Sequence, residues 1–268
     1  MTALRAVSYG GGVRSTALLV LAARGDIDYP LFLHADVGHD SEAKGTIRYV
    51  REVAEPYAAA HDIELVRVRK MSRHGDAVTL RAALMREDSR SVPIPMRMSG
   101  NGAPGNRTCT ADWKIKPVVK ELKRRGATVD TPAVVAVGIS TDEFERARPG
   151  ADPRTPEQHR VYPLLDLGLN RADCMRLIAD EGIPVPPRSA CYFCPFHGRE
   201  AWRELKRDLP DDFRDAGHIE ATVNERRAML GKDPMGMHRG LRPLGECVDD
   251  QMQLTGWEDD CASGACFT

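Results

Sequence analysis

The sequence has no long apolar run. None of its 268 residues lies in a stretch approaching the roughly 18 consecutive apolar residues that a membrane-spanning helix needs. The first residues also lack the basic segment followed by an apolar segment that marks a secretory signal. We therefore expect a cytoplasmic protein without a membrane segment.

The sequence also has no excess of either charge. Lys and Arg total 38 and Asp and Glu total 39, so the formal net charge is −1. No overall field then attracts the chain to nucleic acid or to an anionic membrane. Two local runs, at residues 67–73 and 114–125, are basic. Such runs more often belong to solvated helix faces or loops, so they give little support to a nucleic-acid site.

Internal repeats and low-complexity segments are absent too, and 42% of the residues are hydrophobic. A chain of this length and composition can bury one large core, or one core with a smaller appendage. The sequence changes character after Pro184, where prolines, a cysteine pair and polar stretches begin. We therefore predict a main domain at residues 1–183 and a small cysteine-containing extension at residues 184–268.

Apolar periodicity predicts alternating strands and helices in the main domain. Short apolar runs predict strands at residues 4–8, 31–35, 63–68, 133–139 and 161–165. Apolar residues spaced by three and four positions predict helices at residues 16–24, 42–61, 110–125 and 170–181. This alternation favours an α/β fold with a parallel sheet and helices on both of its faces.

Glycine and proline interrupt this pattern twice. Residues 89–108 and 153–158 are expected to form loops. Two polar helices are expected in the extension, near residues 199–208 and 218–230, followed by an irregular acidic tail.

A glycine-rich loop stands between the first strand and the first helix. Its sequence is SYGGGVRST, from Ser8 to Thr16. Glycines let the backbone approach a phosphate, and the amides at a helix N-terminus point their donors at it. The loop fits neither G-x-x-x-x-G-K-S/T nor G-x-G-x-x-G. The alternative is a glycine turn that only begins an ordinary helix.

Hydroxyls and one cation can complete the predicted anion site. We expect Ser8, Arg14 and Ser15 to act in the chemistry, and Gly10, Gly11, Gly12 and Thr16 to contact the ligand.

Three further residues follow other strands of the predicted sheet and could face the same ligand. Asp36 follows the second strand, where a carboxylate can hold a ribose hydroxyl or Mg²⁺. Gly138 ends a later strand and permits close backbone approach, and Arg146 suits phosphate recognition. A surface helix start explains the intervening acidic pair, Asp142 and Glu143, almost as well.

Three of the seven cysteines have the spacing of a metal site. Cys191 and Cys194 form a C-x-x-C motif followed by proline, and Cys109 opens a helix after the first long loop. Two thiolates three residues apart make half of a tetrahedral site, so a third ligand must come from elsewhere. Two alternatives stay open: a structural zinc site completed by His197, and unliganded thiols that act as a redox pair.

The other four cysteines are of two kinds. Cys174 lies on the apolar face of a predicted helix, which indicates a core position. Cys247, Cys261 and Cys266 lie in the tail, where exposed thiols would suit a redox or persulfide-carrying arm. They could equally be incidental or bind a second metal.

The loop resembles the pyrophosphate loop of the PP-loop ATP pyrophosphatase superfamily, whose core is Ser-Gly-Gly-x-Asp-Ser. Two departures are visible: Tyr9 and an extra glycine lengthen the loop, and Arg14 replaces the usual aspartate. The resemblance implies a Rossmann-like, adenine nucleotide alpha hydrolase-like fold that binds ATP and Mg²⁺ through residues 1–183. Gly138 and Arg146 match positions that face the nucleotide in relatives of phosphoadenosine-phosphosulfate reductase.

The glycine loop, the lone cysteine and the later C-x-x-C together resemble the iron-sulfur sulfur-transfer branch of that superfamily. The resemblance implies a [4Fe-4S] cluster on Cys109, Cys191 and Cys194. It implies an ATP-dependent sulfurtransferase that adenylates an acceptor oxygen and then inserts sulfur. The acceptor would be tRNA or, as in DNA phosphorothioation, a DNA phosphate. The chain's small size favours DNA, and a cysteine desulfurase partner would supply the sulfur.

Two other functions fit the same residues. A reductase of adenylyl sulfate or its 3′-phosphorylated form would use a cysteine in the tail as nucleophile, although the tail lacks the Glu-Cys-Gly-Leu-His setting of such enzymes. A zinc-stapled, non-catalytic nucleotide-binding subunit is the other alternative, and Arg14 is the residue that favours it.

Overall fold

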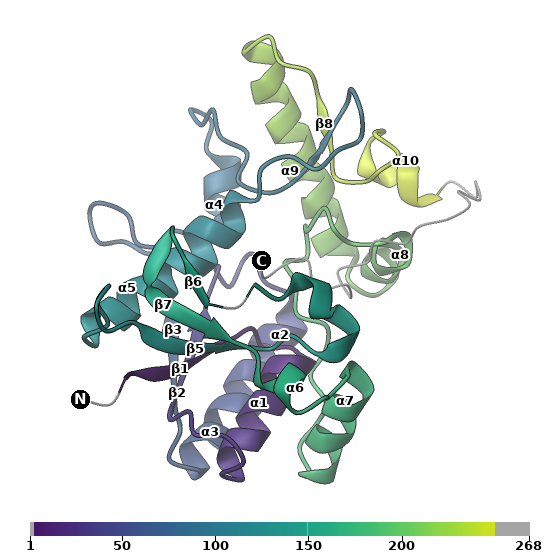
Figure 1. The fold of residues 1–268 in the computed structure, drawn as a ribbon. Coiled ribbons are helices and arrows are strands. Elements are labelled where there is room, and N and C mark those ends of the chain that lie inside the picture. Colours follow the sequence, from purple (N-terminus) through teal and green to yellow (C-terminus); the bar gives the residue numbers. More distant parts are fainter. Residues whose placement is uncertain (1–2, 149, 250–268) are drawn as a thin grey trace. The chain divides into compact units, whose positions relative to one another are not determined.

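A computed structural model describes residues 3–148 and 150–249 (Figure 1). The chain forms two compact units. Of the described residues, the first comprises 3–70 and 112–189, and the second comprises 71–111 and 190–249. The sequence-based division at residue 183 placed Met71–Ala111 in the main domain. In the structure this segment packs with the C-terminal part, because its helix and strand contact elements there.

The first unit is built on one sheet. Within the described residues the sheet has six strands: β1 (Arg5–Tyr9), β2 (Leu31–Ala35), β3 (Glu64–Val68), β5 (Ala133–Val137), β6 (Gly150–Asp152) and β7 (Thr155–Val161). The order is β3-β2-β1-β5-β7-β6; the first five are parallel, and only β6 is antiparallel to its neighbour. The predicted α/β class is confirmed, and the parallel sheet is consistent with an adenine nucleotide alpha hydrolase-like fold.

The strand order reverses at β1. From β1 the chain moves outward to β2 and β3, and then returns to pair β5 with the other side of β1. The loops that follow β1 and β5 therefore leave the sheet in opposite directions. Open α/β sheets bind ligands at the carboxyl ends of the strands at such a reversal.

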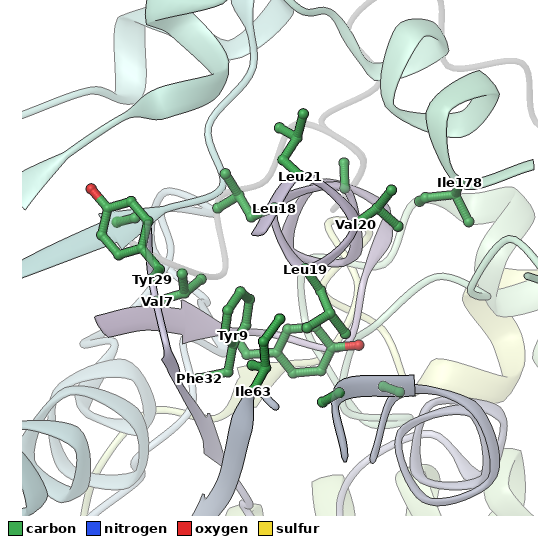
Figure 2. Packing of buried hydrophobic residues seen from close by; sticks show 14 of the residues in the cluster. Val7, Tyr9, Leu18, Leu19, Val20, Leu21, Tyr29, Phe32, Ile63 and Ile178 are labelled. Atoms are coloured by element: carbon green, nitrogen blue, oxygen red, sulfur yellow. The ribbon is translucent and has the colours of Figure 1, made fainter. Parts of the chain in front are cut away.

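One face of the sheet carries most of the helices. They are α1 (Val13–Ala23), α2 (Lys44–Tyr49), the π-helical segment η1 (Val50–Ala54), α3 (Glu55–Ala60), α6 (Pro163–Asp166) and α7 (Arg171–Asp180). Figure 2 shows Leu19 of α1 beside Tyr9 and Phe32 of the sheet, and Val20 of α1 beside Ile178 of α7. The helix predicted at 42–61 is therefore present as three consecutive segments.

The opposite face is covered by α5 (Lys116–Arg124), which follows the π-helical segment η2 (Cys109–Ile115). Val118 and Leu122 of α5 pack on Leu31, Leu33 and Val135. Both faces of the sheet are thus covered, as predicted, and the buried parallel strands read as apolar runs for that reason.

The second unit is mainly helical. Its elements are α4 (Leu80–Met85), β4 (Arg97–Met98), α8 (Arg199–Asp208), α9 (Pro210–Met229), β8 (Met235–Gly236) and α10 (Leu244–Asp249). Trp202 of α8 and Phe213 of α9 are buried against each other, and β4 pairs with β8 as an antiparallel ribbon. Among the described helices of either unit, none combines the length and apolarity needed to cross a membrane.

Two secondary-structure predictions in the first unit are wrong. Residues predicted to form a loop at 153–158 belong mostly to β7, and the strand predicted at 161–165 is largely helix α6. β7 is polar, but Thr155 and Gln158 are buried and hydrogen-bond each other at 2.9 Å, so polar pairing replaces the apolar signal. Pro163 fits the first turn of α6 because its nitrogen has no proton to donate.

The capping box of α7 gives a test of the fold. The Asn170 side chain accepts from the amides of Ala172 and Asp173, and Asp173 accepts from the Asn170 amide. We expect Asn170→Ala to lower the free energy of unfolding by about 1 kcal/mol, because orphan amides lose their acceptor. Chemical denaturation measures the change. Asn170→Asp keeps an acceptor and is the matched control; equal losses in both variants would contradict the cap.

Candidate functional site

The glycine loop lies where the fold predicts a ligand. It connects the carboxyl end of β1 to α1, an 11-residue helix. Gly12 begins that helix with extended backbone, no side chain caps it, and its first turn holds no acidic residue. Since the first amides of a helix have no partner within it, α1 directs hydrogen-bond donors and a partial positive charge toward the loop. This arrangement suits an anion.

The loop backbone is held closely on its neighbours. Gly11 has a φ of +72°, and a Cβ there would lie 3.0 Å from Thr46 and 3.1 Å from Val50. The Ser189 hydroxyl donates a 2.6 Å hydrogen bond to the Gly10 carbonyl. At position 11 only glycine can adopt this positive φ and also fit beside Thr46 and Val50. Ser189 was not predicted, since no local signal links residues 179 positions apart.

Tyr9, the residue that lengthens the loop, is a buried support. Its hydroxyl lies 3.1 Å from the Thr16 hydroxyl, and its ring packs edge-on against Phe32 and His34. His34 Nδ1 donates to the Tyr9 carbonyl at 3.1 Å. Thr16 is fully buried. The hydroxyl predicted to contact the ligand therefore pairs with Tyr9 in this structure.

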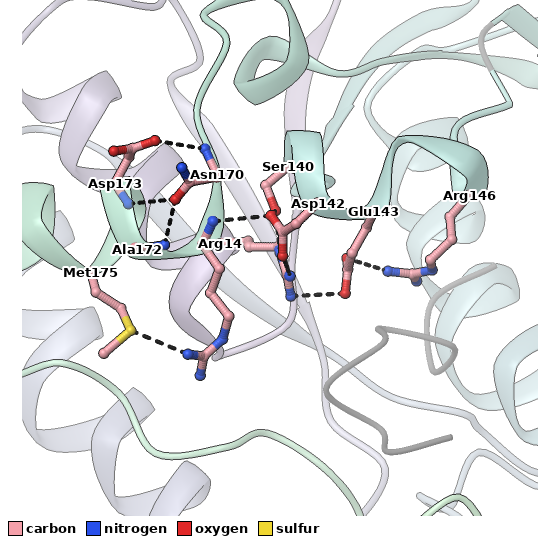
Figure 3. Close-up of polar contacts among 10 residues, drawn as sticks. Arg14, Ser140, Asp142, Glu143, Arg146, Asn170, Ala172, Asp173 and Met175 are labelled. Carbon is pink, nitrogen blue, oxygen red and sulfur yellow. Dashed lines mark hydrogen bonds and ion pairs between the residues drawn. The ribbon is translucent and has the colours of Figure 1, made fainter. Parts of the chain in front are cut away.

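Arg14 spans the strand-order reversal. Its Nε donates to Ser140 Oγ at 2.5 Å, its Nη2 donates to Asp142 Oδ2 at 2.6 Å, and its Nη1 lies 3.0 Å from Glu143 Oε1 (Figure 3). The three partners belong to the segment that follows β5, which continues into the 3₁₀ segment η3 (Thr141–Arg146). Arg14 thus joins the loop after β1 to the segment after β5. Sequence reasoning identified the charges but not this pairing.

Glu143 lies between two arginines. Its side chain is 4% exposed, and its second oxygen accepts from Arg146 Nη1 at 2.5 Å. Burial raises the pKa of Glu143, against the opposing effects of Arg14 and Arg146. Arg146, predicted to face the nucleotide, is therefore engaged with a carboxylate here.

Gly138 permits a close contact between β5 and α1. A Cβ at Gly138 would lie 3.0 Å from the Ser15 nitrogen and 3.1 Å from the Arg14 carbonyl carbon. The first turn of α1 therefore lies beside Gly138, where we had predicted that a ligand would approach the backbone. The Ser15 hydroxyl donates to the Gly12 carbonyl at 3.0 Å, and half-buried Ser8 lies in β1 opposite Leu33 and Val137.

Asp36 lies after β2, as predicted, and both its oxygens have partners. Oδ1 accepts from the Gly38 amide at 2.9 Å, and Oδ2 accepts from Arg69 Nε at 2.7 Å. Burial alone would raise the pKa of Asp36, but these two donors outweigh it and hold the pKa below its usual range. Asp36 is therefore an ionised carboxylate.

The three cysteines of the predicted metal site belong to the second unit. The Cys194 amide donates to the Cys191 carbonyl at 3.1 Å, which closes the C-x-x-C turn. His197 Nε2 lies 2.9 Å from the same carbonyl, so Nε2 carries the proton, and the ring packs edge-on against Trp202. Nε2 is thus occupied in this arrangement, so a metal could take only Nδ1 of this ring.

Arg107 lies near two of these cysteines. Burial lowers the pKa of Arg107, and the neighbouring Cys109 and Cys194 act in the opposite direction. The donor set suits a thiophilic metal. Within the described residues, however, no three His, Cys, Asp or Glu side chains are gathered as a metal-binding group.

Of the remaining cysteines, Cys174 and Cys247 are both buried, although only Cys174 was predicted to be. Cys174 is fully buried in α7, as expected, and burial raises its pKa to about 11. Cys247 was expected in an exposed tail, which is wrong: it lies in α10, is 2% exposed and donates to the Arg242 carbonyl at 3.3 Å. A helical turn carrying buried Leu244, Cys247 and Val248 explains its burial. Cys261 and Cys266 lie outside the described residues.

Comparison with known proteins adds no evidence about this chain. No family model and no curated protein matches the sequence. Among solved structures, the chain is similar to the U34-tRNA thiolase NcsA from Methanococcus maripaludis with its [4Fe-4S] cluster. The similarity covers 97% of this chain and 79% of that one, with 13% sequence identity and a TM-score of 0.41. Likeness of this degree carries no argument about activity or ligands.

The contact at Gly138 can be tested directly. We expect Gly138→Ala to lower the free energy of unfolding by about 1–3 kcal/mol, because the new methyl group meets the backbone of α1. Thermal and chemical denaturation measure the loss.

Gly217→Ala is the control. A Cβ at Gly217, in α9, meets no heavy atom within 4 Å, so this change should be neutral or stabilising. If Gly138→Ala were as stable as Gly217→Ala, the close approach would not exist.

Proposed function

We propose that the chain is an ATP-dependent sulfurtransferase. An acceptor oxygen would attack the α-phosphorus of ATP, the bond to the β-phosphate oxygen would break, and pyrophosphate would leave. The oxygen then belongs to an AMP leaving group. A sulfur nucleophile would displace AMP and take the place of that oxygen on the acceptor.

One observation carries the nucleotide part of the proposal. The glycine loop and the uncapped N-terminus of α1 lie at the carboxyl end of β1, at the strand-order reversal. Amides in this position can receive the charge of the departing pyrophosphate, and preorganised donors of this kind are a large source of rate acceleration.

Arg14 supports the same step. Three residues after β5 hold its guanidinium beside the first turn of α1, so its charge is positioned before any ligand arrives. Since both oxygens of Asp36 are engaged, the Mg²⁺ that accompanies ATP would take most of its ligands from phosphate and water.

The sulfur part rests on the chemistry of the thiols. Cys109, Cys191 and Cys194 would hold a [4Fe-4S] cluster, which when bound offers a site for sulfide. Arg107 would stabilise the charge of the thiolates. The acceptor would be a DNA phosphate or a tRNA base, and a cysteine desulfurase would supply the sulfur.

ATP binding tests the nucleotide site. We expect Arg14→Ala to weaken ATP binding by roughly 10- to 100-fold in isothermal titration, because Asp142 and Glu143 would lose the cation that pairs with them and would then repel the phosphates. Pyrophosphate release in the presence of acceptor should fall with it.

Arg24→Ala is the matched control. Arg24 ends the same helix and pairs with Glu181, so its removal changes the net charge equally and should leave ATP affinity within about twofold. Equal affinities of the two variants would contradict the site. Tighter binding of adenylyl sulfate than of ATP would favour the reductase alternative.

Metal analysis tests the thiols. Protein purified without oxygen should contain about four irons and four sulfides per chain. Cys191→Ser should lose them, because a hydroxyl is a poor ligand for iron-sulfur clusters. Cys174→Ala, a core change in the other unit, should keep them.

One zinc and no iron would instead make the site structural. An iron content unaffected by Cys191→Ser would show that Cys191 is not a ligand.

A further inference from the structure

Several carbonyls of the glycine loop are turned into the protein. The Tyr9 carbonyl accepts from His34 Nδ1 at 3.1 Å, and the Gly10 carbonyl accepts from the Ser189 hydroxyl at 2.6 Å. The Gly12 carbonyl accepts two hydrogen bonds from the first turn of α1, each 3.0 Å long. A carbonyl oxygen carries partial negative charge, so a loop that receives an anion has to direct its carbonyls elsewhere.

The orientation of each carbonyl also sets the direction of an amide. A trans peptide is planar, and its C=O and the N–H of the next residue point in opposite directions. Because the Gly10 carbonyl points to Ser189, the Gly11 amide points away from Ser189. The Gly12 carbonyl likewise sets the amide of Val13, the first residue of α1. Holding these carbonyls therefore presents backbone donors on the opposite side of the loop.

The Gly10–Gly11 peptide depends on this hydrogen bond more than its neighbours do. Glycine has no Cβ, so a peptide between two glycines can rotate at little steric cost. The Gly12 carbonyl takes part in the hydrogen bonding of α1, and Tyr9 is buried at the end of β1. Gly10 and Gly11 lie between the strand and the helix, where the Ser189 hydroxyl holds the peptide that joins them.

A short segment, residues 184–189, carries this hydroxyl, and we call the segment the strap. It forms neither helix nor strand. The Tyr49 hydroxyl donates to the Pro184 carbonyl at 2.7 Å, and the Thr46 hydroxyl donates to the Arg188 carbonyl at 3.4 Å. Both donors belong to α2. Hydrogen bonds from α2 therefore fix the strap at its two ends.

The composition of the strap suits a fixed position. Its sequence is PVPPRS, so half of its residues are prolines. Proline fixes its own φ and restricts the residue before it, so little backbone freedom is lost when the strap is held. A Cβ at Gly45 would lie 3.3 Å from Pro187 Cγ, and a Cβ at Gly12 would lie 3.5 Å from Ser189 Cβ. The strap thus packs on both α2 and the glycine loop.

We propose that Ser189 is a positioning residue of the nucleotide site: its hydroxyl turns the Gly10 carbonyl away from the phosphates of ATP and so presents the Gly11 amide to them. The proposal rests on the proposed function, because it takes the loop to receive phosphate, and it adds a residue from outside the loop. Arg14 fixes the first turn of α1 from the side of β5. Ser189 fixes the preceding peptide from the strap, and both belong to the first unit.

Binding of ATP and of inorganic pyrophosphate to the full-length protein, each with Mg²⁺, tests the role of Ser189. We expect Ser189→Ala to weaken the binding of both ligands by about five- to tenfold in isothermal titration, because the Gly10 carbonyl can then turn toward the phosphates. Equal factors for the two ligands place the effect at the phosphates, since pyrophosphate has no nucleoside. Ser189→Thr keeps the hydroxyl and should restore most of the affinity.

Thr46→Val is the matched control. It removes the hydroxyl that donates to the strap at Arg188, next to Ser189, and keeps a side chain of similar shape beside Gly11. Each variant therefore loses one hydroxyl that donates to a backbone carbonyl, and both hydrogen bonds lie at the same end of the strap. ATP affinity of Thr46→Val should stay within about twofold of the unchanged protein, because the Gly10 carbonyl keeps its donor.

Three outcomes would overturn the role of Ser189. They are ATP affinity of Ser189→Ala within about twofold of the unchanged protein, equal losses in Ser189→Ala and Thr46→Val, and a loss of ATP affinity without a loss of pyrophosphate affinity. Equal losses would show that the hydroxyl only holds the strap. A loss confined to ATP would place the effect at the nucleoside.

Pyrophosphate release from ATP, with sulfide and either a DNA duplex or tRNA present, is measured on the same samples and separates the two proposals. The expected contrast between Ser189→Ala and Thr46→Val in a protein that releases no pyrophosphate would remove the proposed function and keep the role of Ser189. Release with equal affinities in the two variants would do the reverse. No binding of either ligand would overturn both.

Discussion

The ion pairs of Arg14 with Asp142 and Glu143 are the constraint on which the candidate nucleotide site depends. β1 and β5 are neighbours in the sheet, so the loops that follow them begin side by side and then lead to strands on opposite sides. Arg14 joins them, and Gly138 lets the first turn of α1 lie against the end of β5. The result is a helix N-terminus without a cap and a cation fixed beside it, in a position set by packing.

Both units hold ion pairs that the overall charge does not reveal. In the first unit Arg125 faces Glu64, and Arg14 and Arg146 share Glu143. In the second unit Arg81 pairs with Asp215. A net charge of −1 conceals these contacts, because it sums over groups that the fold brings together in pairs.

Most of the first unit follows from local sequence, and the exceptions have identifiable causes. Buried parallel strands such as β2 are apolar on both faces, so the sequence pattern is strong. β7 lies near the edge of the sheet, and its buried residues Thr155 and Gln158 are polar and hydrogen-bond each other. Apolar periodicity in the sequence therefore does not predict this strand. Cys247 is similar: a short helix buries it, although the surrounding sequence is polar and rich in glycine and proline.

The sequence by itself determined the alternation of strands and helices, the glycine loop before α1, the Asn170 cap and the core position of Cys174, because each depends on neighbouring residues or on helical and strand periodicity. Only the tertiary structure decided which charges meet. The partners of Arg14 lie more than 120 positions away, and β4 pairs with β8 although the two strands are far apart in the sequence. Such contacts form when the chain folds back on itself and distant strands pair, so the local sequence pattern does not predict them.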